Sequence, residues 1–210
     1  MPRNSSSESA LEPRRKTARE AAALLYFGLE KEYRQAKLKA AKNLGTRILP
    51  SNLEVATELD RIAEETEGAA RIERLIQMRK DALEIMKLLN RYCPILIGSV
   101  WRGTIKRTSD IDIEAYHDEP ESVKSSLKAE GVKIQKTETV TVTEKGKTSQ
   151  SFHIFAETPG KFIAEITVRN TEEMSKKRTC DTFGDEIKGL TIRNLEKVLK
   201  KHPSQQFLPS

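Results

Sequence analysis

Two aspartates one residue apart, Asp110 and Asp112, lie in the alternating polar and apolar run DIDIEAY that ends at Tyr116. Such alternation predicts a β-strand with one exposed face, and residues two apart project from the same face, roughly 6.5–7 Å apart along the strand. Neighbouring carboxylates repel each other unless a hard cation lies between them, and carboxylate oxygens are ligands of Mg²⁺. The pair therefore predicts a divalent-metal site.

A candidate phosphate-binding turn precedes this strand. The apolar run PILI predicts a short buried strand that ends at Gly98 and Ser99, where a short helix would begin. Glycine permits close backbone approach, and free amides at a helix start suit phosphate. The hydroxyls of Ser99 and Ser109 and the forked guanidinium of Arg102 add donors for phosphate oxygens. Phosphate donors beside paired carboxylates predict a nucleoside triphosphate bound with its metal ions.

A third carboxylate from a neighbouring strand would complete a two-metal site and take the proton of an attacking hydroxyl. The best candidate is Glu165, the lone acid in the apolar run 162–168, since burying an unpaired acid is costly, and we favour it because it comes from a different strand and could close the site from the opposite side. Glu114 is the rival, since it shares a strand face with the aspartate pair. His153 could also reach a substrate phosphate, although a histidine satisfied within its own strand is the simpler interpretation.

The composition narrows the class of protein. The chain has 210 residues and a formal net charge of +6, with 37% hydrophobic and 32% charged residues, so one or two globular domains are expected. Two cysteines, Cys93 and Cys180, exclude a disulfide scaffold and a four-thiolate zinc site. There is no signal-like start and no apolar run near the ~20 residues of a membrane span. We therefore expect a cytoplasmic protein that has no membrane partner. Its modest positive charge favours an anionic binding partner only weakly.

The pattern of the first half is helical. Residues 1–15 are Ser-rich and are expected to form a disordered tail, followed by a helical domain over 16–92. Capping-box patterns at Thr17–Glu20 and Ser51–Glu54 predict two helix starts, and a third helix is expected over 69–91. The first helix should continue to about Gly45, with Leu25, Leu29 and Tyr33 in its apolar stripe. Together these segments predict a small antiparallel three-helix bundle.

The second half, over residues 93–202, alternates strand and helix patterns and is followed by a short tail over 203–210. The strands are expected at 94–98, 110–116, 132–134, 139–143, 151–155 and 162–168, with helices at 120–130 and 190–201 and hairpin turns at 144–147 and 158–160. The fold class is therefore α+β: an N-terminal three-helix region followed by a mixed β-sheet domain with flanking helices.

The run GSVWRGTIKRTSDIDI, residues 98–113, resembles the signature of the DNA polymerase beta-type nucleotidyltransferase superfamily. That signature is Gly-Ser, then an Asp-x-Asp pair on the next strand after ten intervening residues, then a later acid. From about Thr17 the chain also resembles archaeal nucleotidyltransferase-domain proteins, through the stretches LPSNLEVATELD and ERLIQMRKDALEIM. The resemblance implies that residues 93–202 form a nucleotidyltransferase catalytic domain.

The resemblance also assigns roles to residues. It implies that Gly98, Ser99 and Arg102 hold the triphosphate and that Asp110 and Asp112 bind magnesium, as two ions, with manganese as an alternative. The third acid, matched here by Glu165, would ligate metal or act as the base. Polymerase-like members carry aspartate where this chain has glutamate, which makes the third position the one that departs from the family pattern.

The expected reaction transfers a nucleoside monophosphate from a nucleoside triphosphate to an acceptor hydroxyl and releases pyrophosphate. An RNA or tRNA end is favoured as the acceptor, because of the basic helices and the resemblance to terminal transferases. Transfer to a protein hydroxyl or to a small molecule are the alternatives within the same chemistry. A non-catalytic nucleotide- or RNA-binding module is the alternative from another class. The oligomeric state is left open, with a dimer as one possibility.

Overall fold

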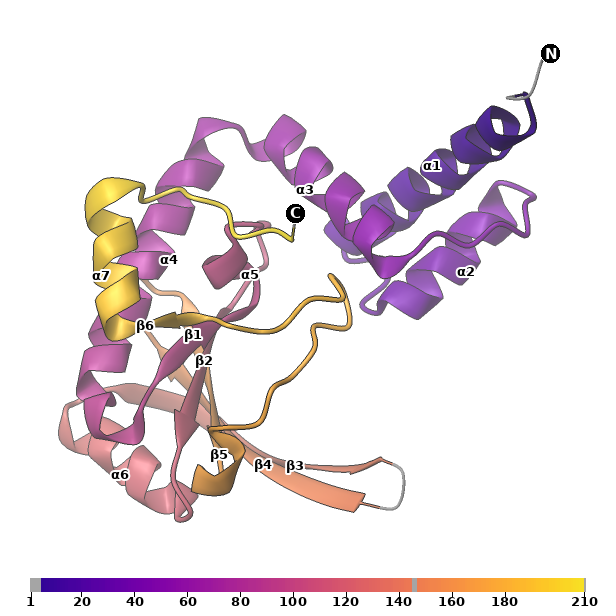
Figure 1. Cartoon of the computed structure of the whole chain (residues 1–210). Helices are drawn as coiled ribbons and strands as arrows, with labels where there is room; N and C mark the ends of the chain where they lie inside the picture. Colours follow the sequence, from indigo (N-terminus) through magenta and orange to yellow (C-terminus); the bar gives the residue numbers. More distant parts are fainter. Residues whose placement is uncertain (1–4, 145–146, 210) are drawn as a thin grey trace. The chain divides into compact units, whose positions relative to one another are not determined.

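The computed structural model describes residues 5–144 and 147–209 of the chain, and the side chains within 11–141 and 150–209 (Figure 1). These residues form two compact units. The helical unit comprises the chain up to Arg71 together with residues 179–185, and the sheet unit comprises Ile72–Arg178 and Glu186–Leu208.

The helical unit contains α1 (Ser5–Tyr26), α2 (Tyr33–Asn43), α3 (Asn52–Glu67) and the first turn of α4 (Ala69–Leu88). The capping box predicted at Ser51 is confirmed: its hydroxyl accepts a hydrogen bond from Glu54 N, and the Glu54 carboxylate accepts one from Ser51 N. The core of this unit is made of small and aliphatic residues, chiefly Ala18, Ala21, Ala22, Leu24, Leu25, Ala36, Ala40, Val55 and Ile62.

Three expectations for this region were wrong. The predicted capping box at Thr17 does not form, because α1 already begins at Ser5 and the Thr17 hydroxyl donates to Pro13 O at 2.9 Å inside the helix. Of the predicted disordered tail, residues 1–4 lie outside the described residues and the rest is helical. The single helix predicted up to Gly45 is interrupted at Gly28, whose φ of +71° ends α1, and this leaves Leu29 63% exposed.

The sheet unit contains six strands within the described residues, in the order β3-β4-β5-β2-β1-β6. Their bounds are β1 Ile95–Ile97, β2 Ile111–Tyr116, β3 Lys133–Glu144, β4 Lys147–Glu157, β5 Ile163–Arg169 and β6 Leu190–Thr191. The helices are α4, α5 (Gly98–Arg102), α6 (Pro120–Ala129) and α7 (Ile192–Lys201), with short 3₁₀ turns at Asn90–Tyr92 and Thr171–Glu173. Only β2 and β5 run parallel, and the other neighbours are antiparallel. The mixed sheet with flanking helices confirms the α+β class.

Several predicted elements of this unit are confirmed, with small differences. The helix predicted over 120–130 is α6, and the turn at 158–160 closes through a hydrogen bond from Thr158 N to Phe162 O. The two strands predicted at 132–134 and 139–143 are one strand, β3, with a register shift between Ile134 and Lys136. Part of the turn predicted at 144–147 lies outside the described residues.

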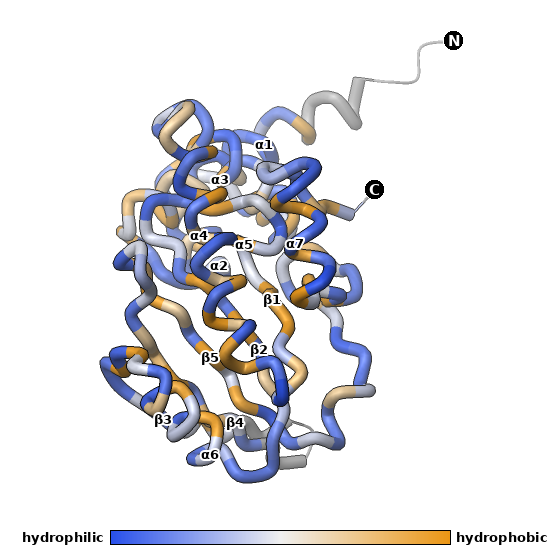
Figure 2. Tube along the Cα trace, turned by 90° about the vertical axis from the view of Figure 1, so that its left-hand side faces the viewer, coloured by the Kyte–Doolittle hydropathy of each residue, from blue (hydrophilic) through white to orange (hydrophobic). Residues whose placement is uncertain are grey.

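The alternation predicted for β2 decides which face of the sheet is buried. Ile111, Ile113 and Ala115 are buried, and they share a core with residues of α4, α6 and α7, including Met78, Met86, Leu89, Val123, Leu127, Leu195 and Val198. In Figure 2 the central strands carry apolar stretches, as this core requires. The intervening residues of β2 and β5 point to the opposite face, which carries the carboxylates.

The predicted domain boundary between residues 92 and 93 differs from the observed division after Arg71. The apolar stripe of α4, including Met78 and Met86, packs in the core of the sheet unit, whereas Ile72 in the first turns of the helix is 45% exposed. A sheet with one apolar face must be covered by helices, and α4 supplies part of that cover. Periodicity alone could not tell which partner the stripe of α4 would meet.

The C-terminal segment, predicted as a short tail over 203–210, is attached to the sheet unit. Phe207 N donates to Arg102 O at 2.9 Å, and the guanidinium of Arg79 donates to the carbonyl oxygens of Pro203 at 2.7 Å and Gln205 at 2.8 Å. Within the described residues, no helix is long and apolar enough to cross a membrane.

Candidate functional site

The predicted metal residues meet through the parallel pairing of β2 with β5. In this register Asp112 lies beside Glu165, and Asp112 lies opposite Ile97 of β1 on its other side. Side chains at paired positions of adjacent strands project from the same face. The backbone therefore brings Asp112 and Glu165 together at the centre of the sheet, although 52 intervening residues separate them in the sequence.

Gly98 makes room for the carboxylate of Asp112. A Cβ atom added to Gly98 would lie 1.9 Å from Asp112 Oδ2, and the backbone has a φ of +67°, which side-chain-bearing residues rarely adopt. The sequence predicted that this glycine would permit a close approach. In the structure, the group that approaches Gly98, the first residue of α5, is the carboxylate of Asp112.

The two aspartates lie in an environment that opposes their ionisation. Burial, together with the negative charges of Glu165, Asp110 and Glu114, raises the pKa of Asp112 to about 7. Burial and Glu165 also raise the pKa of Asp110, and Lys106 acts in the opposite direction. A bound cation would relieve both the burial cost and the mutual repulsion. The chemistry of this donor set therefore fits a hard divalent ion.

The third carboxylate is held by a histidine. Glu165 Oε1 lies 2.6 Å from His153 Nδ1, and the Nε2 atom of the same ring lies 2.8 Å from the hydroxyl of Ser151 on β4. The sequence indicated His153 as a residue that could reach the site, but it gave no reason to single out Ser151. The Ser-x-His spacing on one strand, which places both side chains on one face, was the available signal.

Glu114, the rival third carboxylate, is held by arginines. It is 1% exposed, Arg169 Nε donates to its Oε1 at 2.9 Å, and the two terminal nitrogens of Arg178 bind one oxygen each. Burial alone would raise the pKa of Glu114, yet the hydrogen bonds from Arg178 and the charges of both arginines lower it overall. Both carboxylate oxygens of Glu114 are therefore bound by Arg169 and Arg178.

Of the predicted phosphate-binding residues, Ser99 and Ser109 lie in the segments next to Gly98 and β2, whereas Arg102 contacts the C-terminal segment. Ser99 lies in the first turn of α5 beside Gly98, and the Ser109 hydroxyl accepts a hydrogen bond from Lys106 N at 2.9 Å in the loop before β2. Arg102 is 3% exposed, its Nη1 donates to Phe207 O at 3.1 Å, and its guanidinium lies 4.4 Å from the centre of the Trp101 ring. The structure therefore places Arg102 against the C-terminal segment.

In the part of the chain that is described, no three histidine, cysteine, aspartate or glutamate side chains already surround a common metal position. Asp112 Oδ2 is directed to Gly98 and Glu165 Oε1 to His153. The pairing of β2 with β5 places the backbones of Asp112 and Glu165 side by side. Their side chains would have to rotate to bring both carboxylates to one metal ion.

No protein-family model matches this chain, and no curated protein matches it in sequence. Solved structures with a similar fold include Cid1 in complex with the UTP analogue UMPNPP, at 17% identity and a TM-score of 0.33. They also include a cytoplasmic RNA terminal U-transferase, at 18% identity and a TM-score of 0.32. Each alignment covers 53% of this chain and 36% of the other, so the chain spans about a third of the length of the structures it resembles.

Proposed function

We propose that the sheet unit is a metal-dependent nucleotidyltransferase that moves a nucleoside monophosphate from a nucleoside triphosphate to an acceptor hydroxyl. The observation that carries this proposal is the pairing of Asp112 with Glu165 in adjacent strands, directly beside the glycine turn that opens α5. Buried like charges without a compensating cation are costly, so such an arrangement favours a role in binding a charged ligand.

Asp110, Asp112 and Glu165 would hold two Mg²⁺ ions, with Mn²⁺ as an alternative. When bound, such ions supply positive charge for the phosphate oxygens and for the leaving pyrophosphate. Gly98 and Ser99 would offer backbone amides and a hydroxyl to the phosphates, and Ser109 a further hydroxyl. Arg102 would join them only after release from its hydrogen bond with Phe207 O.

The remaining chemistry falls to the acceptor and Glu165. The acceptor oxygen attacks the α-phosphorus, the bond from that phosphorus to the bridging oxygen breaks, and pyrophosphate leaves. Glu165 can take the acceptor's proton at Oε2, while His153 holds Oε1 and limits rotation of the side chain. The acceptor that we propose is the end of an RNA strand, because lysines and arginines recur along helices of the chain such as α2.

The test is a transfer assay with each of the four α-labelled nucleoside triphosphates, with Mg²⁺ or Mn²⁺, and with RNA, DNA, protein or no added acceptor. We expect label on RNA and release of pyrophosphate, and we expect Asp112→Asn to remove both. Label on protein or on a small molecule would replace the RNA acceptor within the same chemistry. Metal-independent nucleotide binding without pyrophosphate release would show a non-catalytic module and overturn the proposal.

A further inference from the structure

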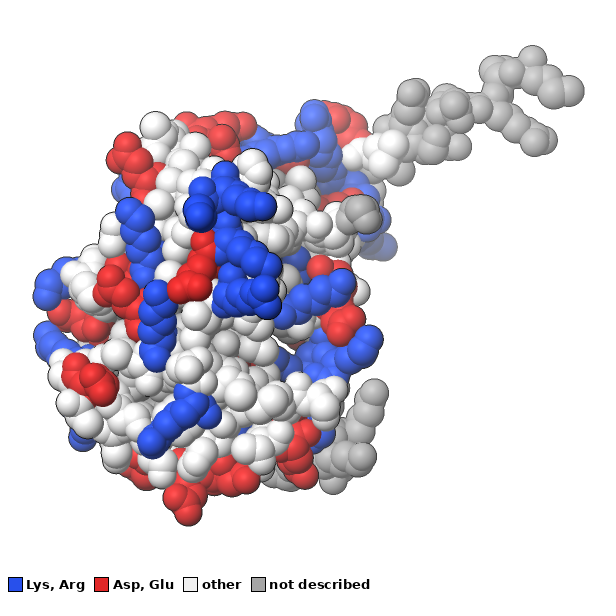
Figure 3. All heavy atoms as spheres, turned by 60° about the vertical axis from the view of Figure 1, so that its left-hand side comes forward, with Lys and Arg blue, Asp and Glu red and all other residues white. Residues whose placement is uncertain are grey.

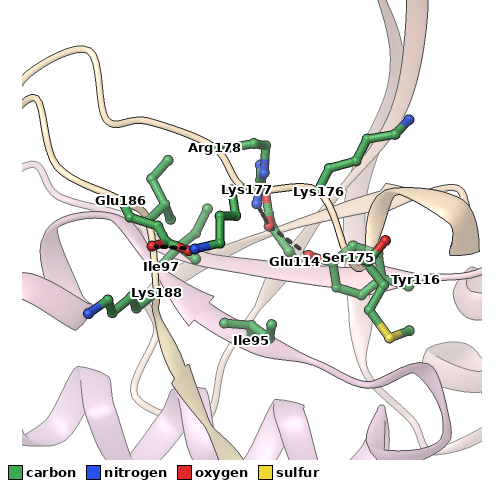
Figure 4. Close-up of a pocket in the computed structure, with 12 residues that line it drawn as sticks. Ile95, Ile97, Glu114, Tyr116, Ser175, Lys176, Lys177, Arg178, Glu186 and Lys188 are labelled. Carbon is green, nitrogen blue, oxygen red and sulfur yellow. Dashed lines mark hydrogen bonds and ion pairs between the residues drawn. The ribbon is translucent and has the colours of Figure 1, made fainter.

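A cavity of about 350 Å³ lies on the carboxylate face of the sheet (Figure 4). Its sheet side is formed by Ile95 and Ile97 of β1 and by Glu114 and Tyr116 of β2. Its other side is formed by the segments 174–178 and 186–188, which lie across this face after β5. All the residues that line the cavity therefore belong to the sheet unit.

The cavity adjoins the proposed metal residues. Ile97, one of its lining residues, is the register partner of Asp112 in the β1–β2 pair. Glu114, another, is two residues further along β2 and projects from the same face as Asp112. A ligand bound in this cavity would thus extend toward the carboxylates along β2.

The lining carries an excess of positive charge. Its cations are Lys176, Lys177, Arg178 and Lys188, against two acids, Glu114 and Glu186. Arg178 is bound to buried Glu114, so this pair forms part of the cavity wall (Figure 4). The three lysines are exposed, and the ion pairs of Lys176 with Glu172 and of Lys177 with Glu186 are long, at 3.8 and 3.5 Å. Lysines in such long, exposed pairs can exchange them for phosphates at little cost.

The sheet side of the cavity is apolar where it is accessible. Ile95 and Ile97 are partly exposed, and Met174 on the opposite side is 45% exposed. An apolar surface beside several cations matches a ligand that has a flat apolar ring and a phosphate in each repeating unit. Single-stranded nucleic acids have this character, because each base offers an apolar face and each linkage a negative charge.

We propose that this cavity binds the terminal nucleotides of a single-stranded RNA acceptor, with Lys176, Lys177 and Lys188 contacting its phosphates. The proposal rests on the proposed function, because it names the acceptor site of that reaction. The overall charge does not by itself locate such a site: on the face shown in Figure 3, basic and acidic side chains are interspersed. The cavity is distinguished by its position beside Asp112 and by its unbalanced lining.

The test is fluorescence anisotropy of a labelled 15-nucleotide single-stranded RNA of mixed sequence, titrated with the full chain at several salt concentrations. The cavity variant combines Lys176→Gln, Lys177→Gln and Lys188→Gln. The matched control combines Lys197→Gln, Lys200→Gln and Lys201→Gln, three exposed lysines of α7 outside the cavity lining. Circular dichroism and thermal melting establish that both variants fold.

We expect the cavity variant to bind RNA roughly tenfold more weakly, since each exposed contact contributes modestly. The slope of log Kd against log salt should fall by about 2, at ~0.7 per lost phosphate contact on a single strand. The control variant should bind nearly as well as the unmodified chain. Equal weakening of both variants, an unchanged cavity variant, or tighter binding of a poly-glutamate peptide than of RNA would each overturn the proposal.

The same variants separate this proposal from the proposed function. Loss of RNA binding in the cavity variant, with no nucleotide transfer by the unmodified chain, would support the cavity and contradict the enzyme. Transfer to RNA with an unchanged KM for RNA in the cavity variant would support the enzyme and contradict the cavity. If both proposals hold, KM for RNA rises in the cavity variant while binding of labelled ATP with Mg²⁺ is unchanged.

Discussion

His153 Nδ1 lies 2.6 Å from Glu165 Oε1, across the antiparallel pair of β4 and β5. The imidazole is fixed at its other nitrogen by Ser151, at 2.8 Å. A glutamate has one more rotatable bond than an aspartate, so its carboxylate needs an additional contact to hold one orientation. The histidine supplies that contact at the proposed third carboxylate.

Replacement of His153 by alanine should therefore affect metal use more than nucleotide binding. We expect kcat to fall roughly tenfold and the Mg²⁺ concentration for half-maximal transfer to rise by a similar factor, as is typical for loss of a residue that orients a ligand. KM for the nucleotide should change little. Direct Mn²⁺ binding, followed by electron paramagnetic resonance, measures the same loss without turnover, and an unchanged affinity would contradict the orienting role.

Gly98→Ala should abolish transfer, because the new Cβ would have to displace Asp112 Oδ2 from a position 1.9 Å away. A shift of this carboxylate by about 1 Å can cost about 100-fold in rate. Gly131→Ala is the matched control, since Gly131 has a φ of +76° and an added Cβ there meets nothing within 4 Å. Both variants carry the backbone strain of about 1–2 kcal/mol, and only Gly98→Ala should lose activity. Equal activity of the two would show that the collision is relieved without consequence.

The contrast between Glu165 and Glu114 shows which features of the site could be predicted from the sequence and which could not. The sequence predicted that Glu165 lies on a strand neighbouring that of Asp112, which the pairing of β2 with β5 confirms, and that Glu114 shares a strand face with Asp112. The arginines that bind Glu114 follow it by 55 and 64 residues. No local pattern could pair them with it, because the pairing depends on the parallel register of β2 and β5 and on the path of the chain after β5.

Arg102 and α4 are two further cases in which local sequence patterns did not predict a long-range contact. The motif predicted that Arg102 binds phosphate, and nothing in the sequence indicated that its guanidinium would donate to Phe207 O, 105 residues later in the chain. The helix over 69–91 was predicted as part of a three-helix bundle, yet the apolar residues of α4 pack in the core of the sheet unit. Local spacing predicts which residues share a face, whereas long-range contacts decide what that face meets.

Glu114→Gln and Glu165→Gln should separate the two candidate third carboxylates. Glu165→Gln should lose transfer and weaken Mn²⁺ binding, because it removes the charge beside Asp112. Glu114→Gln should retain Mn²⁺ binding but leave Arg169 and Arg178 without their buried anion, which should destabilise the chain by about 3 kcal/mol or more. Urea denaturation and Mn²⁺ titration of both variants measure the two effects. The reverse pattern would make Glu114 the metal ligand.

Arg79 should hold the C-terminal segment in place. It is 0% exposed, and besides its bonds to Pro203 O and Gln205 O it donates to the carbonyls of Val100 at 3.1 Å and Trp101 at 2.9 Å. Burial lowers the pKa of Arg79 to about 10. Lysine lacks the forked donor geometry, so Arg79→Lys should leave buried carbonyls unpaired, at about 1–3 kcal/mol each.

Urea denaturation measures this loss of stability, and hydrogen exchange should show faster exchange at Gln205 and Phe207 in Arg79→Lys. Arg193→Lys, at an exposed position of α7, is the control and should change neither quantity. A variant that is destabilised with unchanged exchange at these amides would mean that other contacts hold the segment.

Asp112 should make the stability of the metal-free chain fall as pH rises. Its pKa is raised from 3.8 to about 7, so between these values the native state holds a proton that the unfolded chain has released. Stability from this group is therefore fully present below pH 4 and is lost as pH approaches 7, by up to about 4 kcal/mol at 1.36 kcal/mol per pKa unit.

Asp112→Asn removes the titration, so in EDTA this variant should become progressively more stable than the unmodified chain from pH 4.5 to pH 8. Added Mg²⁺ should narrow the difference at pH 8, because the ion binds the ionised native state. Urea denaturation across this range measures both effects, and parallel pH profiles of the two proteins would show that Asp112 stays ionised throughout.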